Sequence, residues 1–277
     1  MSDVLFDKRP NGVAVITLNR PDSLNAMGGE LMPLLAQYLR ECSTDTSVRC
    51  VVLTGAGRAF CAGGDVKGMA ARKDILGGNG DASSSSSPAA AFARGLQGLR
   101  QSQKDTSYML HTMPKVTIAM VNGHAVGAGL SLALACDFRI ASDRAKFATA
   151  FRNVGFSGDF GGSYFMTKMA GGETARYLYY TGETVEAEKA RELGLCSRVF
   201  PHDDLEAETM KIADHIATGP TLAYARMKEN LNRAETADLA SALDAEALNM
   251  TLSGQTKDHM EAAMAFVQKR QPTFTGE

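Results

Sequence analysis

The first part of this chain alternates apolar strands with an amphipathic helix. Val13–Leu18 is apolar and β-branched and stops at Asn19-Arg20-Pro21, as a strand followed by a turn does. Apolar residues recur at helical spacing over residues 30–42, and residues 48–53 are nearly all apolar, as in a strand buried on both faces. A strand, a helix and a further strand form the unit that builds parallel sheets. We therefore expect an α/β protein.

Later in the chain the pattern changes from strands to helices. Strands are expected at residues 116–121, 138–141 and 146–149, and helices at residues 163–170, 173–180, 185–193, 205–217, 221–234, 237–251 and 255–270. This order predicts an α/β core over residues 1–200 and a helical region over residues 201–277. Residues 72–88 contain the low-complexity run GGNGDASSSSSP. Because the strand-helix pattern resumes after it, we expect a flexible insertion within the core.

Composition narrows the class of protein further. The 277 residues are 44% hydrophobic and 22% charged, with a formal net charge of -2, which argues against a broad nucleic-acid interface. Five scattered cysteines without a C-x-x-C pair predict reduced thiols rather than a disulfide framework or a metal site. No window reaches the roughly eighteen apolar residues of a membrane span, and the N-terminus has no apolar signal core. A cytoplasmic protein is the expectation.

Two glycine-rich passages follow strands, and a third carries an isolated acid. Residues 55–68 read GAGRAFCAGGDVKG, and Gly127-Ala128-Gly129 leads into an apolar helical stretch. The N–H groups at such a helix start lack partners and can hold an anion or a developing oxyanion. Asp159 lies further on, in GFSGDFGGS. We expect the turn to polarise a carbonyl and Asp159 to move a proton beside it.

Motifs along almost the whole chain resemble those of the enoyl-CoA hydratase/isomerase family, the crotonase superfamily. They are, in order, Asn19-Arg20-Pro21 with Leu24-Asn25-Ala26, residues 59–65, Met113-Pro114-Lys115, Val121-Asn122-Gly123, Gly127-Ala128-Gly129, Cys136-Asp137 and the closing residues Ala265-Phe266, Lys269-Arg270, Pro272 and Phe274. The resemblance implies a core of ββα repeats forming packed sheets, with a helical C-terminal trimerisation region. It also implies trimers or hexamers that act on acyl-CoA thioesters. Coenzyme A then enters with the substrate, and no separate cofactor or metal is expected.

The resemblance implies roles for particular residues. The backbone N–H groups of Gly64 and Ala128 would form an oxyanion hole, because an enolate oxygen needs two convergent donors. The residues expected along the thioester and pantetheine are Ala26, Ala62, Gly63, Asp65, Val66, Lys67 and Gly127. Lys269 and Arg270 are candidates for the CoA phosphates, joined by Arg20 or Arg58. A solvated surface charge explains each of these basic residues as well.

This chain departs from the family's hydratases at two positions. Those enzymes place two glutamates in the site, where this chain has Ser131 and Phe151. Addition of water needs one group to activate the water and one to deliver a proton, so this loss puts simple hydration in doubt. Asp159 remains. Dienoyl-CoA isomerases, the ring-epoxide and enoyl isomerases of aromatic degradation, and naphthoate synthases carry an aspartate at this place.

Asp159 therefore has two interpretations. As a catalytic group it would serve as base and then as acid, with a pKa raised by apolar neighbours such as Phe156 and Phe160. As a structural residue it would cap the helix that follows. Structural roles are the simpler explanation for His124 and for the Cys61 thiol.

Several activities are consistent with this reading of the site. The leading one is enoyl-CoA isomerisation with Asp159 as acid and base. The alternatives are an enoyl-CoA hydratase that uses Asp159 and an ordered water, C–C bond hydrolysis or ring opening of a cyclic ketoacyl-CoA, and an acyl-CoA-binding protein without catalysis.

Overall fold

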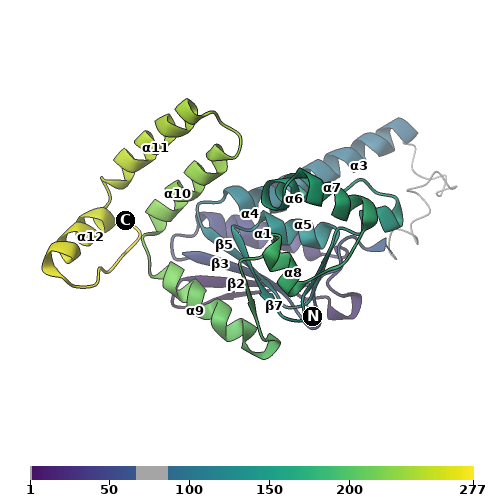
Figure 1. Ribbon diagram of the computed structural model, residues 1–277, viewed down its shortest axis with the longest axis horizontal. Coiled ribbons are helices and arrows are strands. Elements are labelled where there is room, and N and C mark those ends of the chain that lie inside the picture. Colours follow the sequence, from purple (N-terminus) through teal and green to yellow (C-terminus); the bar gives the residue numbers. More distant parts are fainter. Residues whose placement is uncertain (1, 67–86) are drawn as a thin grey trace.

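The computed structural model describes residues 2–66 and 87–277 and shows two sheets covered by helices (Figure 1). The six-stranded sheet has the order β1-β2-β3-β5-β7-β10, and the four-stranded sheet has the order β4-β6-β8-β9. The strands are β1 (Val4–Lys8), β2 (Val13–Leu18), β3 (Cys50–Gly55), β4 (Ala59–Cys61), β5 (Val116–Val121), β6 (His124–Val126), β7 (Phe138–Ser142), β8 (Lys146–Ala148), β9 (Val185–Glu186) and β10 (Arg198–Phe200).

From β3 to β8, consecutive strands enter different sheets. β3, β5 and β7 pair in parallel in the large sheet, and the strands that directly follow them, β4, β6 and β8, pair in parallel in the small sheet. A helix follows β6, so β5, β6 and α5 form one ββα unit. The architecture expected from the sequence is confirmed.

Helices cover both faces of the large sheet (Figure 1). They are α1 (Leu31–Thr44), α3 (Pro88–Gln103), α4 (Met109–Thr112), α5 (Ala128–Ala135), α6 (Gly162–Ala170), α7 (Gly172–Thr181), α8 (Ala187–Glu192), α9 (Leu205–Ala217), α10 (Thr221–Ala234), α11 (Leu239–Ser253) and α12 (Lys257–Gln268). One turn of π-helix, Lys104–Tyr108, joins α3 to α4. Short 3-10 turns occupy Pro21–Ser23, Phe151–Val154 and His202–Asp204.

Alternate residues of the central strands serve two cores. On β2, Ala14 and Ile16 belong to the cluster packed under α1 and α5, whereas Val13 and Val15 belong to the cluster packed under α9. This is the side-chain alternation of a strand buried on both faces. α9 falls within the helical region expected at residues 201–277, yet it packs on the sheet beside β3, β5 and β7.

The last three helices project from the core. α10 pairs with α11, and α12 lies at the end of the molecule away from α3 (Figure 1). Of the insertion expected at residues 72–88, residues 72–86 lie outside the described part of the chain. Ser87 and Pro88 begin α3, where the Ser87 side chain accepts a hydrogen bond from the Ala90 N–H. No helix in the described ranges is long and apolar enough to cross a bilayer.

Candidate active site

The two glycine-rich turns lie against each other. Gly63 has φ +86°, and a Cβ added to it would lie 2.7 Å from the Val126 carbonyl oxygen and 3.2 Å from the Ala128 nitrogen. A Cβ on Gly129 would lie 2.2 Å from the Cys61 carbonyl oxygen. No larger residue fits this approach, and only glycine adopts the Gly63 conformation readily. The glycines therefore bring the two backbones into contact.

Gly64 and Ala128 each present a backbone N–H at this contact. Ala128 is the first residue of α5, so its N–H has no partner inside the helix. Gly64 forms an isolated bridge with Met27, in which the Met27 N–H donates to the Gly63 carbonyl oxygen at 2.7 Å. Within the described chain, neither the Gly64 nor the Ala128 amide donates a hydrogen bond. Both donors are therefore available to a ligand.

A buried asparagine fixes the first turn from behind. The Asn25 Nδ2 donates to the carbonyl oxygens of Ala56 at 3.0 Å and Ala59 at 2.8 Å. The Cys61 thiol donates to the Asn25 carbonyl oxygen at 3.1 Å. Burial raises the pKa of the Cys61 thiol to about 12, so the thiolate that a nucleophile needs does not form near neutral pH. This supports the structural role predicted for Cys61.

Arg20 and Asp65 hold the same turn at its outer edge. The Arg20 guanidinium lies 3.6 Å from the Asp65 carboxylate and donates to the Ala26 carbonyl oxygen at 2.7 Å. Asp65 and Arg20 therefore act together as an anchor for the turn. The interaction also occupies the Arg20 side chain, which the sequence offered as a phosphate ligand.

Asp159 lies on a loop of left-handed residues. Gly158 has φ +106°, Phe160 φ +51° and Gly161 φ +80°. The Asp159 Oδ1 is buried without a hydrogen-bond partner among the described residues. Burial, which disfavours the charged carboxylate, raises the pKa of Asp159 to about 6. A carboxyl group with this pKa can exchange protons near neutral pH.

The alternative role of Asp159 as a helix cap is wrong. Gly161 is the N-cap residue of α6, and no side chain caps that helix. The Asp159 backbone carbonyl accepts a hydrogen bond from the Gly162 N–H at 3.1 Å, but its carboxylate makes no such bond. The helix is thus closed by backbone groups, which leaves the carboxylate free for another use.

Tyr179 of α7 fills the space between the two positions where hydratases carry glutamates. Phe151 is buried and its ring stacks on Tyr179, with centroids 5.9 Å apart. Ser131 is buried and donates to the Gly127 carbonyl oxygen at 3.3 Å. A Cβ on Gly162 would lie 2.3 Å from the Ser131 Oγ and 2.7 Å from the Tyr179 hydroxyl. Burial, and then the Asp159 charge, raise the pKa of Tyr179 to about 12.

The sequence had not singled out Tyr179. It lies in an ordinary amphipathic helix, among other aromatic residues, and nothing in its spacing points to the glycine turns. Only the packing of α7 on the Phe151–Val154 turn brings it beside Ser131 and Asp159.

The remaining predicted site residues differ in how far they are buried. Ala26 is buried beside the first turn, Ala62 is partly buried there, and Val66 is 48% exposed. Lys67 lies outside the described residues. Arg58 is exposed, and His124 is a half-buried residue of β6.

Lys269 and Arg270 do not reach the glycine turns of their own chain. They follow α12, which lies at the far end of the molecule (Figure 1). The Arg270 guanidinium donates two hydrogen bonds to the Glu261 carboxylate, at 2.5 and 2.8 Å. This pairing raises the pKa of Arg270 and lowers that of Glu261 to about 2. Within one chain these two residues therefore lie apart from the site.

Fold and site together define a class: an α/β enzyme built from ββα repeats, with two glycine turns and one desolvated carboxyl group in its candidate site. Comparison with known proteins identifies the family. The family described as enoyl-CoA hydratase/isomerase matches residues 8–277, so this chain belongs to the enoyl-CoA hydratase/isomerase family of acyl-CoA enzymes.

Relatives match along the whole length. The 1,2-epoxyphenylacetyl-CoA isomerase of Escherichia coli is 35% identical over 277 residues and is covered, like this chain, to 100%. The 2,3-dehydroadipyl-CoA hydratase of the same organism is 32% identical over 276 residues, again covering 100% of both chains. A crystal structure of an enoyl-CoA hydratase from Bacillus anthracis superposes with a TM-score of 0.87 at 31% identity, covering 100% of both chains.

Proposed function

We propose that this enzyme isomerises an enoyl-CoA thioester and that Asp159 carries the proton. The Gly64 and Ala128 N–H groups donate to the thioester oxygen, and the Asp159 carboxylate removes a proton from the α- or γ-carbon. The electron pair of that C–H bond moves into the enolate, whose charge the two amides stabilise. Asp159 then returns the proton to the other carbon, so the double bond moves and nothing is added.

The observation that carries this proposal is the state of the Asp159 carboxyl group. It is desolvated, its Oδ1 lacks a hydrogen-bond partner in the described chain, and its pKa is raised to about 6. Such a group is mostly ionised at neutral pH and still accepts a proton readily. One carboxyl group suffices when the same proton leaves one carbon and returns to another. A relative that is 35% identical over the whole chain is named as an acyl-CoA isomerase, which supports isomerisation as the reaction class, although its named substrate is an epoxide.

Hydration is the second candidate, because a relative named as a hydratase is 32% identical over the whole chain. In that reaction an ordered water bound to the Asp159 carboxylate would attack the β-carbon. Ser131 and Phe151 count against it, because neither side chain carries the carboxyl group that would serve as a second acid.

Turnover of matched substrates tests the proposal. Purified enzyme is given 3-enoyl-CoA and 2-enoyl-CoA thioesters of several acyl groups, and the products are separated by chromatography. Isomerised thioester is the expected product, whereas 3-hydroxyacyl-CoA would favour hydration. Asp159→Asn is expected to lose most of the turnover while keeping its affinity for CoA. Full turnover by Asp159→Asn would reject the role of Asp159, and CoA binding without turnover of any thioester would favour a silent binding protein.

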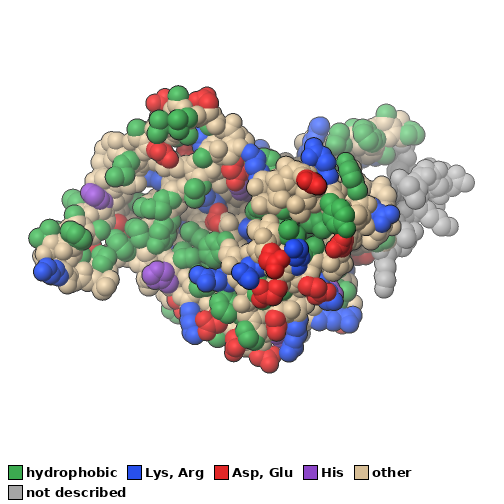
Figure 2. Space-filling view, in the orientation of Figure 1, with side chains coloured by type: hydrophobic (Ala, Val, Ile, Leu, Met, Phe, Trp, Pro, Cys, Tyr) green, Lys and Arg blue, Asp and Glu red, His purple; other side chains and the backbone are tan. Residues whose placement is uncertain are grey.

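We also propose that the chain associates into trimers or hexamers through its C-terminal helices. Large apolar side chains are exposed there, including Leu231 at 70%, Leu239 at 75% and Phe266 at 84%. Figure 2 shows such side chains gathered between these helices and the core. Association would also carry Lys269 and Arg270 toward the site of another subunit, where they would meet the CoA phosphates.

Light scattering after size exclusion tests this association. The expected mass is three or six times the 29.5 kDa of one chain. Leu231→Glu places a charge on the exposed apolar face of α10 and is expected to shift the mass toward one chain. A monomeric parent protein would reject the proposal. No cofactor beyond the coenzyme A of the substrate is proposed, and a cytoplasmic location stays a prediction.

A further inference from the structure

The last residue of α3 contacts the loop that carries Asp159. The Gln103 Oε1 accepts a hydrogen bond from the Phe160 N–H at 2.9 Å. α3 itself has no buried residue, and the chain then passes through one turn of π-helix, Lys104–Tyr108. Such turns are rare and occur often at functional sites. Gln103 is partly buried at this junction, whereas most of α3 is exposed.

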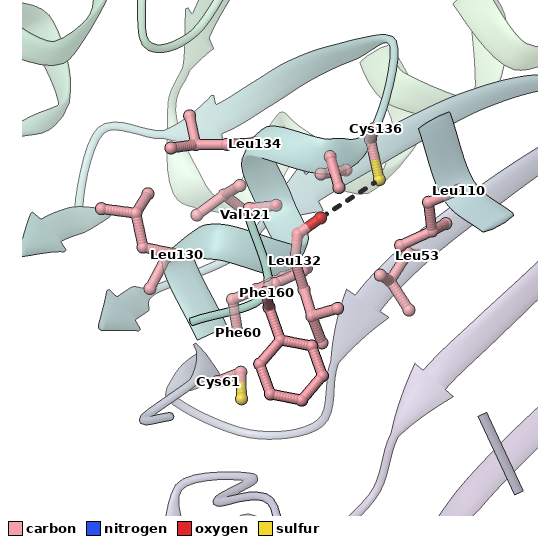
Figure 3. Close-up of a cluster of buried hydrophobic side chains, with 14 of the residues drawn as sticks. Leu53, Phe60, Cys61, Leu110, Val121, Leu130, Leu132, Leu134, Cys136 and Phe160 are labelled. Atoms are coloured by element: carbon pink, nitrogen blue, oxygen red, sulfur yellow. Dashed lines mark hydrogen bonds between the residues drawn. The ribbon is translucent and has the colours of Figure 1, made fainter. Parts of the chain in front are cut away.

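Phe160 needs this support because its backbone is unfavourable. It has φ +51°, a conformation that a bulky side chain adopts only when its surroundings hold it there. The Phe160 ring is buried in the same cluster as Cys61 and Leu132 (Figure 3). Its N–H is bound by Gln103. The residue after Asp159 is thus fixed at both its side chain and its amide.

A cavity of about 520 Å³ adjoins this contact. Gln103 lines it from the end of α3, and Gly161 lines it from the Asp159 loop. The titratable groups around the loop come from four elements. Lys104 and Tyr108 of the π-helical turn, His111 of α4 and Tyr164 of α6 line the cavity, and Tyr179 faces the loop from α7. A ligand bound in the cavity would therefore contact both Gln103, which supports the loop, and Gly161 of the loop itself.

We propose that Gln103 is a positioning residue for proton transfer: its side-chain carbonyl, bound to the Phe160 N–H, holds Asp159 at the angle required by the substrate carbon. The inference rests on the proposed proton transfer by Asp159. In this proposal Gln103 acts through the Phe160 amide and makes no contact with the substrate, so its loss should slow the chemical step and leave substrate binding unchanged.

Three variants separate this role from general stability. Gln103→Leu removes the acceptor, and Gln103→Glu keeps an acceptor while adding a negative charge near Asp159. The matched control is Gln101→Leu, because Gln101 lies on the same helix, is exposed, and donates to the Asp105 carboxylate at 2.9 Å. Hydrogen exchange of the peptide containing Phe160, measured by mass spectrometry, reports the contact without any substrate.

Gln103→Leu should lower kcat about tenfold or more with KM changed less than about twofold, because misplacement acts on the reacting geometry. Its Phe160 amide should exchange faster than in the parent. Gln103→Glu should restore slow exchange and move the acidic limb of the pH–rate profile upward, because two neighbouring carboxyl groups raise each other's pKa. Gln101→Leu should match the parent in its steady-state constants, in the exchange of the Phe160 amide and in its pH–rate profile.

The possible failures are distinguishable. If Gln103→Leu matches Gln101→Leu in kcat and in exchange while Asp159→Asn is inactive, the role of Gln103 is rejected and the proposed function stands. If Asp159→Asn keeps full turnover, the proposed function is rejected and the role of Gln103 with it. The inference would also be overturned if Gln103→Leu lowered kcat only as far as its fraction of folded protein fell, and Gln103→Glu left the pH profile unshifted.

Discussion

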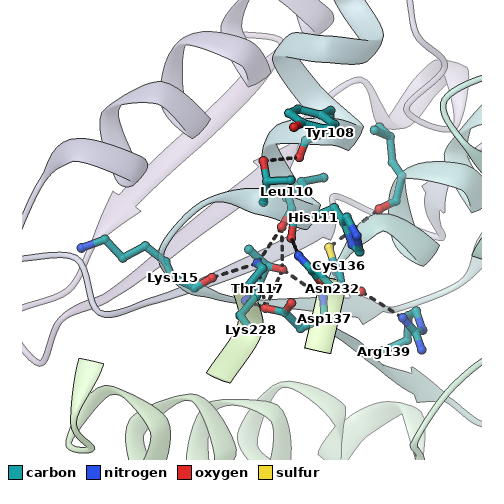
Figure 4. A network of polar contacts seen from close by, with 12 residues as sticks. Tyr108, Leu110, His111, Lys115, Thr117, Cys136, Asp137, Arg139, Lys228 and Asn232 are labelled. Atoms are coloured by element: carbon teal, nitrogen blue, oxygen red, sulfur yellow. Dashed lines mark hydrogen bonds and ion pairs between the residues drawn. The ribbon is translucent and has the colours of Figure 1, made fainter. Parts of the chain in front are cut away.

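The Lys228 Nζ of α10 lies 3.0 Å from the Asp137 Oδ2 (Figure 4). Asp137 directly follows Cys136, the C-cap of α5, which is the helix that starts at the second glycine turn. The same ammonium group donates to the carbonyl oxygens of Leu110 at 2.9 Å and Lys115 at 3.0 Å. All three of its protons are therefore used. Lys228 is only 6% exposed, and burial lowers its pKa despite the Asp137 charge. This contact joins the C-terminal helices to the core.

Lys228→Met is expected to destabilise the protein by about 2–4 kcal/mol, because removing one member of a buried pair leaves its partner without compensation. The cost stays below that of an isolated buried charge, since the Asp137 Oδ2 still accepts from the Thr117 N–H at 2.7 Å. Urea unfolding followed by circular dichroism measures the difference. Catalytic constants at low temperature should change little, because the pair lies outside the glycine turns.

Lys257→Met is the control for that measurement. Lys257 pairs with Glu277, but its side chain is 71% exposed and water screens the interaction. Its unfolding midpoint should equal that of the parent. If Lys228→Met also unfolds at the parental midpoint, the pair does not fasten α10 to the core.

Local sequence signals predicted the glycine turns and most helices. Gly63 has φ +86°, and a Cβ added to Gly129 would lie 2.2 Å from a carbonyl oxygen. Glycine alone meets such demands readily, so both positions fall in glycine-rich motifs that the sequence shows. The apolar strands were recognisable because both of their faces are buried. β1 was missed because its apolar run, residues 4–6, is only three residues long and is followed by the exposed Asp7 and Lys8.

Contacts between distant segments were not predictable in the same way. Gln103 and Lys228 occupy helix positions whose spacing is typical of solvated residues, and only the packing of α3 and α10 gives each a partner from a distant segment. Arg270 showed the converse: its place in a motif suggested a phosphate ligand, while the structure pairs it with Glu261. One sequence without its fold does not specify which charges meet.

Asp159→Asn is expected to stabilise the protein above pH 6 by about 1–3 kcal/mol, discounted for the partial exposure of the carboxyl group. The pKa of Asp159 is raised from 3.8 to about 6 in the folded state by burial. The folded protein therefore binds more protons than the unfolded one between these values, and stability falls as pH rises through them. Thermal unfolding from pH 3.5 to 8 measures this effect.

Parent and Asp159→Asn should differ least near pH 3.5, where the carboxyl group is protonated in the folded state and mostly protonated in the unfolded state, and should diverge as pH rises toward 6. A constant difference at every pH would contradict burial as the cause of the shift. Glu261→Gln offers the opposite sign, because the pKa of Glu261 is lowered to about 2 by Arg270. Any loss in that variant should be present at neutral pH and vanish in acid.

The pH dependence of kcat/KM should show an acidic limb near pH 6. The proposed base is the Asp159 carboxylate, and its pKa is raised to about 6 by burial, so protonation below this value removes the base. An exposed aspartate would place the limb near pH 4 instead. Steady-state rates from pH 4.5 to 8.5 with one 3-enoyl-CoA substrate distinguish the two, and a limb near pH 4 would contradict the proposed environment of Asp159.

Gly63→Ala is expected to lower kcat/KM at least about 100-fold, because the added Cβ forces apart the two turns that present the oxyanion donors. That Cβ would lie 2.7 Å from the Val126 carbonyl oxygen, on a residue with φ +86°. The matched control is Gly95→Ala in α3, where nothing lies within 4 Å of the new methyl group. Gly95→Ala should keep full activity and gain up to about 1 kcal/mol in stability, since alanine favours a helix over glycine.

Stability and activity, measured on both variants, separate strain from catalysis. Gly63→Ala should bind CoA with nearly parental affinity while turnover falls, because the proposed phosphate ligands, Lys269 and Arg270, lie far from Gly63 in sequence and are not altered. If Gly63→Ala turns over its substrate as fast as Gly95→Ala does, the Gly64 and Ala128 amides do not act as a pair. The thioester oxygen would then need another donor, and the close approach of the turns at Gly63 would be a feature of packing alone.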